Sequence, residues 1–150
     1  MQAESVAQAA LFCCLLFAAS AWDIRKRIVP DMLNVLIFCA GLPTFTPDKL
    51  AGTLLALPLL IAALMREGGM GGGDIKLTAA AGFVLGLPAG IVGLILGLSA
   101  ALLYHLVIRV IRKLKQLKAP AASKSVLPLA PFLSAGFFAA YFMNLGGLIL

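Results

Sequence analysis

Hydrophobic residues fill six runs along the chain, and polar residues interrupt these runs only briefly. The runs cover residues 6–22, 32–45, 50–65, 75–87, 89–111 and 126–150. Because helices in lipid satisfy their own backbone hydrogen bonds, this pattern predicts an all-α fold, a polytopic membrane protein with six transmembrane helices. Several runs are shorter than the roughly 20 residues that a perpendicular span needs.

The junction between the fourth and fifth runs is "GLPAG", residues 86–90. A single helix over residues 75–111 would extend over roughly 55 Å, well beyond a hydrocarbon core of about 30 Å. A hairpin of two helices is therefore the better prediction for this segment.

Basic residues gather on one side of a six-helix topology. The first, third and fifth loops share that side, and Lys49 alone lies opposite. The positive-inside rule makes the basic side cytoplasmic, so both termini are expected on the non-cytoplasmic side. The basic residues in question are Arg25, Lys26, Arg27, Arg66, Lys76, Arg109, Arg112, Lys113, Lys115, Lys118 and Lys124.

The composition agrees with a membrane setting. The chain of 150 residues is 62% hydrophobic and 12% charged, whereas a soluble domain is roughly 25% charged. We expect one membrane-embedded domain over residues 1–150. The net charge of +6 follows from the topology and from attraction to anionic headgroups, so no nucleic acid is expected. The start "MQAESVAQ" contains no basic residue, so we expect a retained first helix instead of a signal peptide.

Most acidic side chains have simple structural interpretations. Asp31 and Asp48 each stand at a predicted helix start and are expected to be N-caps. Asp23 follows Trp22 at the end of the first helix, where its charge opposes the helix dipole. It is therefore either a functional group or a charge neutralised by Arg25, Lys26 or Arg27.

Asp74 follows the glycine-rich stretch "GGMGGG" and opens the short fourth helix. An ionisable group at this depth is costly and usually functional, although a simple N-cap is the alternative. Asp23 and Asp74 both lie at cytoplasmic ends of predicted helices, so the topology permits them to meet. Two adjacent carboxylates cannot both ionise easily, so one can hold a proton while the other activates water, as in aspartic proteases. The glycines would leave room for an extended peptide.

Three segments of the chain resemble one family. "WDIRKRIVPDMLN" at residues 22–34 is similar to the first-aspartate motif of type IV prepilin peptidases, and "GGGDIKL" at residues 71–77 to the second. Gly71, Gly73 and Asp74 match the GxGD pattern, and Lys76 matches a basic position of the family. "LPLAPFLSAG" at residues 127–136 is similar to the family's last-helix segment.

The resemblance implies an intramembrane aspartyl endopeptidase with Asp23 and Asp74 as its catalytic pair. Its partners would be prepilin or pseudopilin precursors, cut after a glycine at the cytoplasmic face of a prokaryotic inner membrane. Gly71 and Gly73 would shape the loop. Asp31 stands where the family often has asparagine and would add a third nearby carboxylate.

Larger family members carry a cytoplasmic insert with paired cysteines and also methylate their product. The first loop here is too short for such an insert, so the chain resembles the small, peptidase-only form associated with Flp/Tad-type pili. No cofactor, no metal site and no S-adenosylmethionine dependence are expected. Cys13, Cys14 and Cys39 lack metal-ligand spacing and are expected to be buried packing residues.

Two other readings use the same residues. A small proton-coupled transporter would protonate and deprotonate Asp23 and Asp74 without cutting a peptide. A non-catalytic assembly component of a pilus or secretion system would need neither acid. His105, within the fifth run, could relay protons, but a hydrogen bond within the bundle is the favoured expectation.

Overall fold

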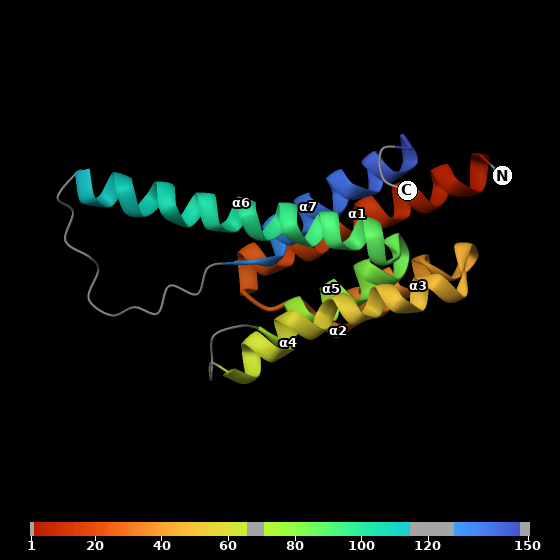
Figure 1. Cartoon of the computed structure of the whole chain (residues 1–150), viewed down its shortest axis with the longest axis horizontal. Helices are drawn as coiled ribbons and strands as arrows, with labels where there is room; N and C mark the ends of the chain where they lie inside the picture. The colour runs from red at the N-terminus through yellow and green to blue at the C-terminus, as the bar shows by residue number, and fades with distance from the viewer. Residues whose placement is uncertain (1, 66–70, 115–127, 148–150) are drawn as a thin grey trace.

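A computed structural model describes residues 2–65, 71–114 and 128–147 of the chain, and over these residues all of the regular secondary structure is helical (Figure 1). The all-α expectation is therefore confirmed for the described part. The α-helices are α1 (Gln2–Lys26), α2 (Asp31–Ala40), α3 (Pro47–Gly52), α4 (Ala56–Met65), α5 (Gly72–Leu85), α6 (Leu87–Leu114) and α7 (Ala130–Leu145), with 3-10 turns η1 (Leu42–Thr44) and η2 (Thr53–Leu55).

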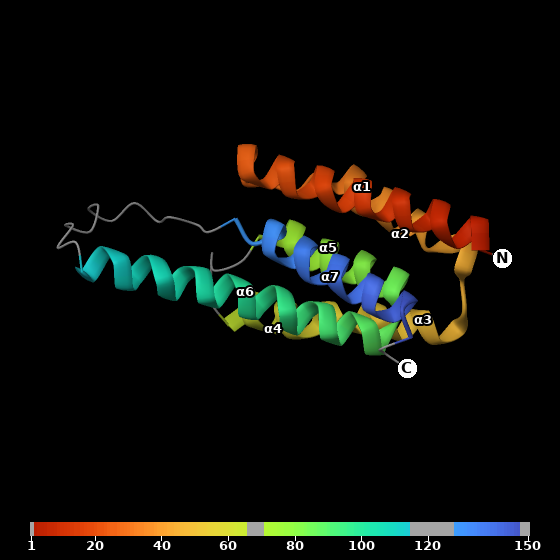
Figure 2. The same cartoon turned by 90° about the horizontal axis from the view of Figure 1, so that it is seen from above.

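The described helices run up and down one bundle in six passes, because α3, η2 and α4 follow one another as a single pass (Figures 1 and 2). The start of α1 and the end of α7 lie at the same end of the bundle. The predicted hairpin is also confirmed, because α5 ends at Leu85 and α6 begins at Leu87 and runs back. Gly86 permits this reversal with a φ of 79°, which a residue with a side chain rarely adopts.

The helices differ in whether they could cross a membrane. Among the described residues, three segments are long and apolar enough to do so: Val6–Lys26, Pro47–Met65 and Leu87–Leu114. Asp31–Thr44 and Ala130–Leu145 are apolar but shorter. With 14 residues, α5 extends over only about 21 Å. The six-span topology and the side on which the termini lie therefore stay predictions.

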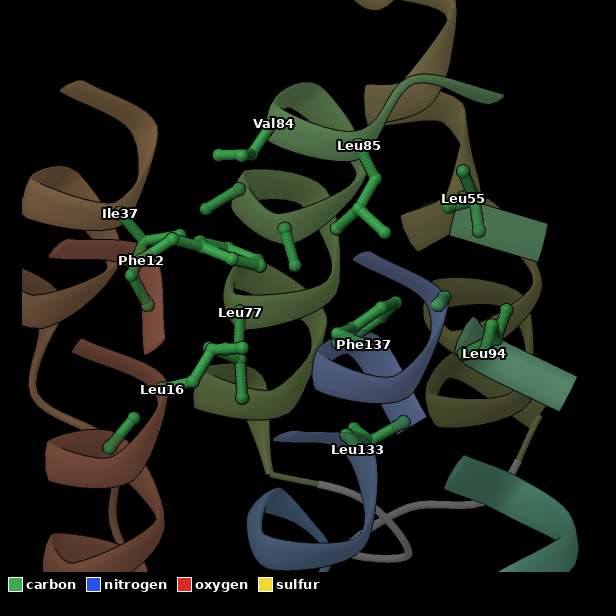
Figure 3. Packing of buried hydrophobic residues seen from close by; sticks show 14 of the residues in the cluster. Phe12, Leu16, Ile37, Leu55, Leu77, Val84, Leu85, Leu94, Leu133 and Phe137 are labelled. Atoms are coloured by element: carbon green, nitrogen blue, oxygen red, sulfur yellow. The ribbon is translucent and has the colours of Figure 1, made fainter. Parts of the chain in front are cut away.

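Helix α5 lies at the centre of the bundle and contacts α2, α3, α4, α6 and α7. Its apolar residues cover its whole circumference, which is typical of a helix that is buried on all sides. Leu77 and Val84 of α5 pack in one core cluster with Phe12 of α1, Ile37 of α2 and Phe137 of α7 (Figure 3). This central position holds the first turn of α5 among the ends of several helices.

Glycines allow two pairs of helices to approach very closely. A Cβ at Gly136 of α7 would overlap the backbone of Gly93 and Gly97 on α6, and a Cβ at Gly82 of α5 would overlap Gly52 of α3. Without a hydrophobic force between helices in lipid, such small-residue contacts are a main source of packing energy. The longest interface of the bundle, between α6 and α7, is built in this way.

Two of the sequence-based expectations about packing are wrong. Cys14 and Cys39 are exposed and Cys13 is half-buried, because these positions lie on outward faces of α1 and α2. His105 is exposed and makes no hydrogen bond to another described residue. The C-terminal part of α6 extends beyond the ends of the other described helices (Figures 1 and 2). Hydropathy identified these helices but could not tell which face would be covered.

Gly136→Val should lower the free energy of unfolding by about 1–3 kcal/mol, because the new side chain must push α6 and α7 apart. Unfolding in detergent micelles, followed by circular dichroism, measures the loss. Gly146→Ala is the matched control, since its nearest neighbour would lie at an ordinary 3.4 Å. Equal stability of the two variants would contradict the close α6–α7 packing.

Candidate active site

The two acids singled out from the sequence lie together at one end of the bundle. Asp23, in the last turns of α1, and Asp74, in the first turn of α5, are 5% and 9% exposed. Both line one small pocket of about 120 Å³, with Arg27, Val29 and the three glycines at 71–73 among its other walls. The structure thus brings together two carboxylates that are 51 residues apart in sequence (74 − 23 = 51).

Asp23 is held by the start of α7. Its Oδ2 atom accepts a hydrogen bond of 3.1 Å from the backbone N–H of Ala130, the first residue of that helix. Helix N-termini carry unpaired N–H groups and a partial positive charge, so this contact stabilises the carboxylate form. Ala130 lies within the segment that resembles the family's last helix, but its backbone N–H leaves no residue-type signal in the sequence, so only the structure reveals this contact.

The alternative that a basic neighbour neutralises Asp23 is wrong. Among the described residues the only ion pair is elsewhere, so neither Arg25, Lys26 nor Arg27 pairs with Asp23. Lys26 instead lies over the ring of Trp22, with 4.9 Å from its Nζ atom to the ring centroid. The buried carboxylate therefore depends on the Ala130 N–H.

Asp74 is not an N-cap, which excludes its simple structural interpretation. Gly71 occupies the cap position, and the backbone N–H of Asp74 donates to the Gly71 carbonyl at 3.1 Å. The Oδ1 atom of Asp74 is buried and has no hydrogen-bond partner among the described residues. A polar atom in this state is costly unless substrate or water uses it.

The apolar run that could enter a membrane begins only at residue 75, so Asp74 lies just outside it. Burial, and then the charge of Asp23, raise the pKa of Asp74 to about 6. A carboxyl group with this pKa holds a proton under mildly acidic conditions while its partner remains available as a base.

The three consecutive glycines of the pocket differ in what surrounds them. A Cβ at Gly73 would lie 3.0–3.2 Å from the Cβ, carbonyl oxygen and nitrogen of Val29, whereas a Cβ at Gly72 would meet nothing within 4 Å. At Gly71 the nearest atom would be Asp74 Oδ2 at an ordinary 3.5 Å. Gly73 therefore permits the close approach of α5 to the α1–α2 connection.

Lys76 and Asp31 form an ion pair outside the pocket. The Lys76 Nζ atom donates to both carboxylate oxygens of Asp31 at 2.7 and 2.8 Å, so Asp31 is not a third carboxylate beside the pair. The expectation that Asp31 caps α2 is wrong, because Pro30 holds the cap position. Asp48 is likewise not a cap, since Thr46 precedes α3. In both places a proline shifted the helix start by one or two residues.

Three larger cavities lie elsewhere among the described residues, and none of them is lined by two acids. An apolar groove of about 480 Å³ lies between α1 and α7 and is lined by Phe17, Ser134 and Phe138 among others. A groove of about 400 Å³ between α2 and α5 includes Asn34, whose buried amide has no described partner and was missed by sequence reasoning. We place the chemistry in the smallest of these four cavities because it alone among them is lined by two buried carboxyl groups.

The pocket offers two carboxylates and no metal ligands beyond them. Within residues 2–65, 71–114 and 128–147, no group of three or more His, Cys, Asp or Glu side chains could hold a metal ion. Two adjacent carboxylates that share a proton can activate water and protonate a carbonyl oxygen, which is the chemistry of aspartic peptidases. The two carboxylates thus suit the hydrolysis of a peptide bond.

Comparison with known proteins supports the same class. The model of the type IV leader peptidase family matches residues 10–106, which include both aspartates. The chain belongs to this family. A curated member, the prepilin leader peptidase/N-methyltransferase of Bacillus subtilis (strain 168), is 33% identical over 142 residues, covering 89% of this chain and 54% of the relative. The chain thus spans about half the length of that leader peptidase. No solved structure matches the chain.

Gly73→Ala should destabilise the leader peptidase fold by about 1–3 kcal/mol, since the new methyl group presses on Val29. Gly72→Ala is the control and should be neutral or stabilising by up to about 1 kcal/mol, because alanine favours the helix. Denaturant unfolding in micelles compares the two. If both variants behaved alike, α5 would not approach Val29 as described.

Proposed function

We propose that this protein is a membrane-embedded aspartic endopeptidase that removes the leader from prepilin or pseudopilin precursors. Family membership supports a peptidase, and one observation carries the catalytic assignment. Asp23 and Asp74 are both buried, both line the same pocket, and the Oδ1 atom of Asp74 has no hydrogen-bond partner among the described residues.

The two aspartates take different roles because their surroundings differ. The N–H of Ala130 offsets part of the cost of burying the Asp23 carboxylate, whereas no such donor reaches Asp74 Oδ1 among the described residues, so we assign Asp23 as the base that accepts a proton from water. Asp74 carries the shared proton and donates it to the scissile carbonyl oxygen as the water oxygen bonds to the carbonyl carbon. The tetrahedral intermediate then collapses. The carbon–nitrogen bond breaks, the proton on Asp23 passes to the departing amine, and one hydroxyl proton of the intermediate returns to Asp74 as the carbonyl group re-forms.

The dimensions of the pocket support cleavage after glycine. A space of about 120 Å³ with glycines 71–73 on its wall accepts extended backbone more readily than a bulky side chain. A glycine on the substrate would let its backbone approach the carboxylates closely. The apolar helix that follows the cleavage site would then remain in the bilayer.

Six membrane crossings and an inner-membrane location complete the proposal. The aspartates lie at the end of the bundle where α1 ends with Arg25 and Lys26, whereas α3, which contains Lys49, lies at the opposite end (Figure 1). The positive-inside rule makes the aspartate end cytoplasmic and leaves both termini outside. A transporter would place such acids near the midplane instead, which disfavours that alternative.

A peptidase without methyltransferase activity fits the connection between α1 and α2. Only residues 27–30 join these helices, which leaves no room there for a cysteine-bearing insert. We therefore propose that neither zinc nor S-adenosylmethionine is required. The name of the Bacillus subtilis relative includes N-methyltransferase, and that activity is not proposed for this chain.

Asp23→Asn and Asp74→Asn should each abolish cleavage, because an amide keeps the size of the side chain but cannot carry the shared proton. Each variant is co-expressed with a prepilin, and the product is examined by mobility shift and N-terminal sequencing. Asp31→Asn is the matched control and should retain cleavage, since its carboxylate pairs with Lys76 outside the pocket. Full cleavage by either catalytic variant would refute the assignment.

The pH profile should show an alkaline limb near the pKa of Asp74. That pKa is raised to about 6, so the singly protonated pair is lost, and kcat/KM falls, as pH rises through this value. The apparent value belongs to the coupled pair. Initial rates between about pH 5 and 8 measure it, with the folded fraction followed in parallel. A rate that stayed constant across this range would argue against Asp74 as the proton donor.

A further inference from the structure

Arg27 has an unusual backbone conformation at the edge of the pocket. Its φ is 55°, and it is the only residue other than glycine with a positive φ in the described part of the chain. Its backbone N–H donates to the carbonyl oxygen of Asp23 at 2.7 Å, which ends α1 in the left-handed geometry normally assigned to glycine. A side chain in this conformation is energetically unfavourable, so its presence at a functional site suggests a use.

The three adjacent basic residues have different surroundings. Lys26 lies over the ring of Trp22, and Arg25 is outside the lining of the pocket. Arg27 lines the pocket together with Asp23 and Asp74, is exposed, and forms no ion pair with any described carboxylate. Of the three, Arg27 alone lines the pocket that contains both acids, and it pairs with none of the described carboxylates.

We propose that Arg27 binds the substrate by donating hydrogen bonds to a backbone carbonyl oxygen next to the scissile bond. A guanidinium group presents five N–H donors in a planar fork and accepts none, so it suits carbonyl oxygens. Bound there, the substrate chain is held extended over the two carboxylates. This role rests on the proposed peptidase function and explains why an arginine occupies a glycine-like position.

A second reading of Arg27 is attraction to anionic lipid headgroups, which Arg25 and Lys26 could share. If that were its role, removing Arg27 would have no larger effect than removing Arg25 or Lys26. The effect of removing the Arg27 charge would also depend on the presence of anionic lipid. Position and lipid composition therefore distinguish the two roles.

The test compares Arg27→Gly, Arg27→Lys and the control Arg25→Gln in nanodiscs of phosphatidylcholine alone. The probe is a synthetic precursor peptide with a leader, a glycine and an apolar segment. Arg27→Gly removes the side chain while relieving the backbone, so its melting temperature should equal or exceed that of the wild type. Its KM should rise about tenfold or more with a smaller change in kcat, as expected for a lost charged hydrogen bond.

Arg27→Lys should have an intermediate KM, and Arg25→Gln should remain within about twofold of the wild type. Arg27→Gly kinetics equal to those of Arg25→Gln would overturn the role of Arg27 while leaving the peptidase intact. An Arg27→Gly defect seen only when anionic lipid is added would also overturn it. No cleavage by the folded wild type would instead overturn the peptidase function, and the substrate contact with it.

Discussion

The structure is constrained by the burial of two carboxylates in a chain that is 62% hydrophobic. An isolated carboxylate in an apolar interior is so unfavourable that it must gain hydrogen bonds or a proton. Asp23 gains the N–H of Ala130 across 107 residues of sequence, and this contact ties the end of α1 to the start of α7. Asp74 gains no such donor in the described structure, which leaves it suited to carrying a proton. The asymmetry between the acids is therefore set by where α7 begins.

Close helix packing makes this arrangement possible. Three helix ends can meet around one small pocket only if their backbones approach more closely than side chains normally allow. Gly73 against Val29, Gly52 against Gly82, and the α6–α7 contact through Gly136 all supply this closeness. Within the core, these glycines allow helix backbones to approach each other closely. Only at turns such as Gly86 does the backbone freedom of glycine matter. Because α5 lies at the centre of the bundle, these separate contacts together fix the position of Asp74.

Charges near the pocket are sorted by their partners. Lys76 is paired with Asp31, Lys26 lies over Trp22, and Arg27 lines the pocket without pairing with a described carboxylate. Such sorting lets a basic membrane surface coexist with a buried acidic pair, because the nearest cations do not neutralise Asp23. The same surface can then attract headgroups while the pocket retains its own protonation behaviour.

Much of the fold was predictable from hydropathy, since helical runs and their interruptions are local properties of the chain. The hairpin at Gly86 followed from length alone, and the two aspartates followed from their cost in an apolar segment together with family resemblance. The N-cap assignments of Asp31 and Asp48 were wrong because Pro30 and Pro47 altered where each helix begins. The exposed positions of Cys14 and His105 could not be predicted, because periodicity does not say which neighbour covers a face. By itself, the sequence determined the helices, their breaks and the choice of acids. Only the tertiary structure decided that Ala130 binds Asp23, that Lys76 pairs with Asp31 and that Arg27 borders the pocket. These contacts depend on which helices lie side by side, and those helices are far apart in the chain.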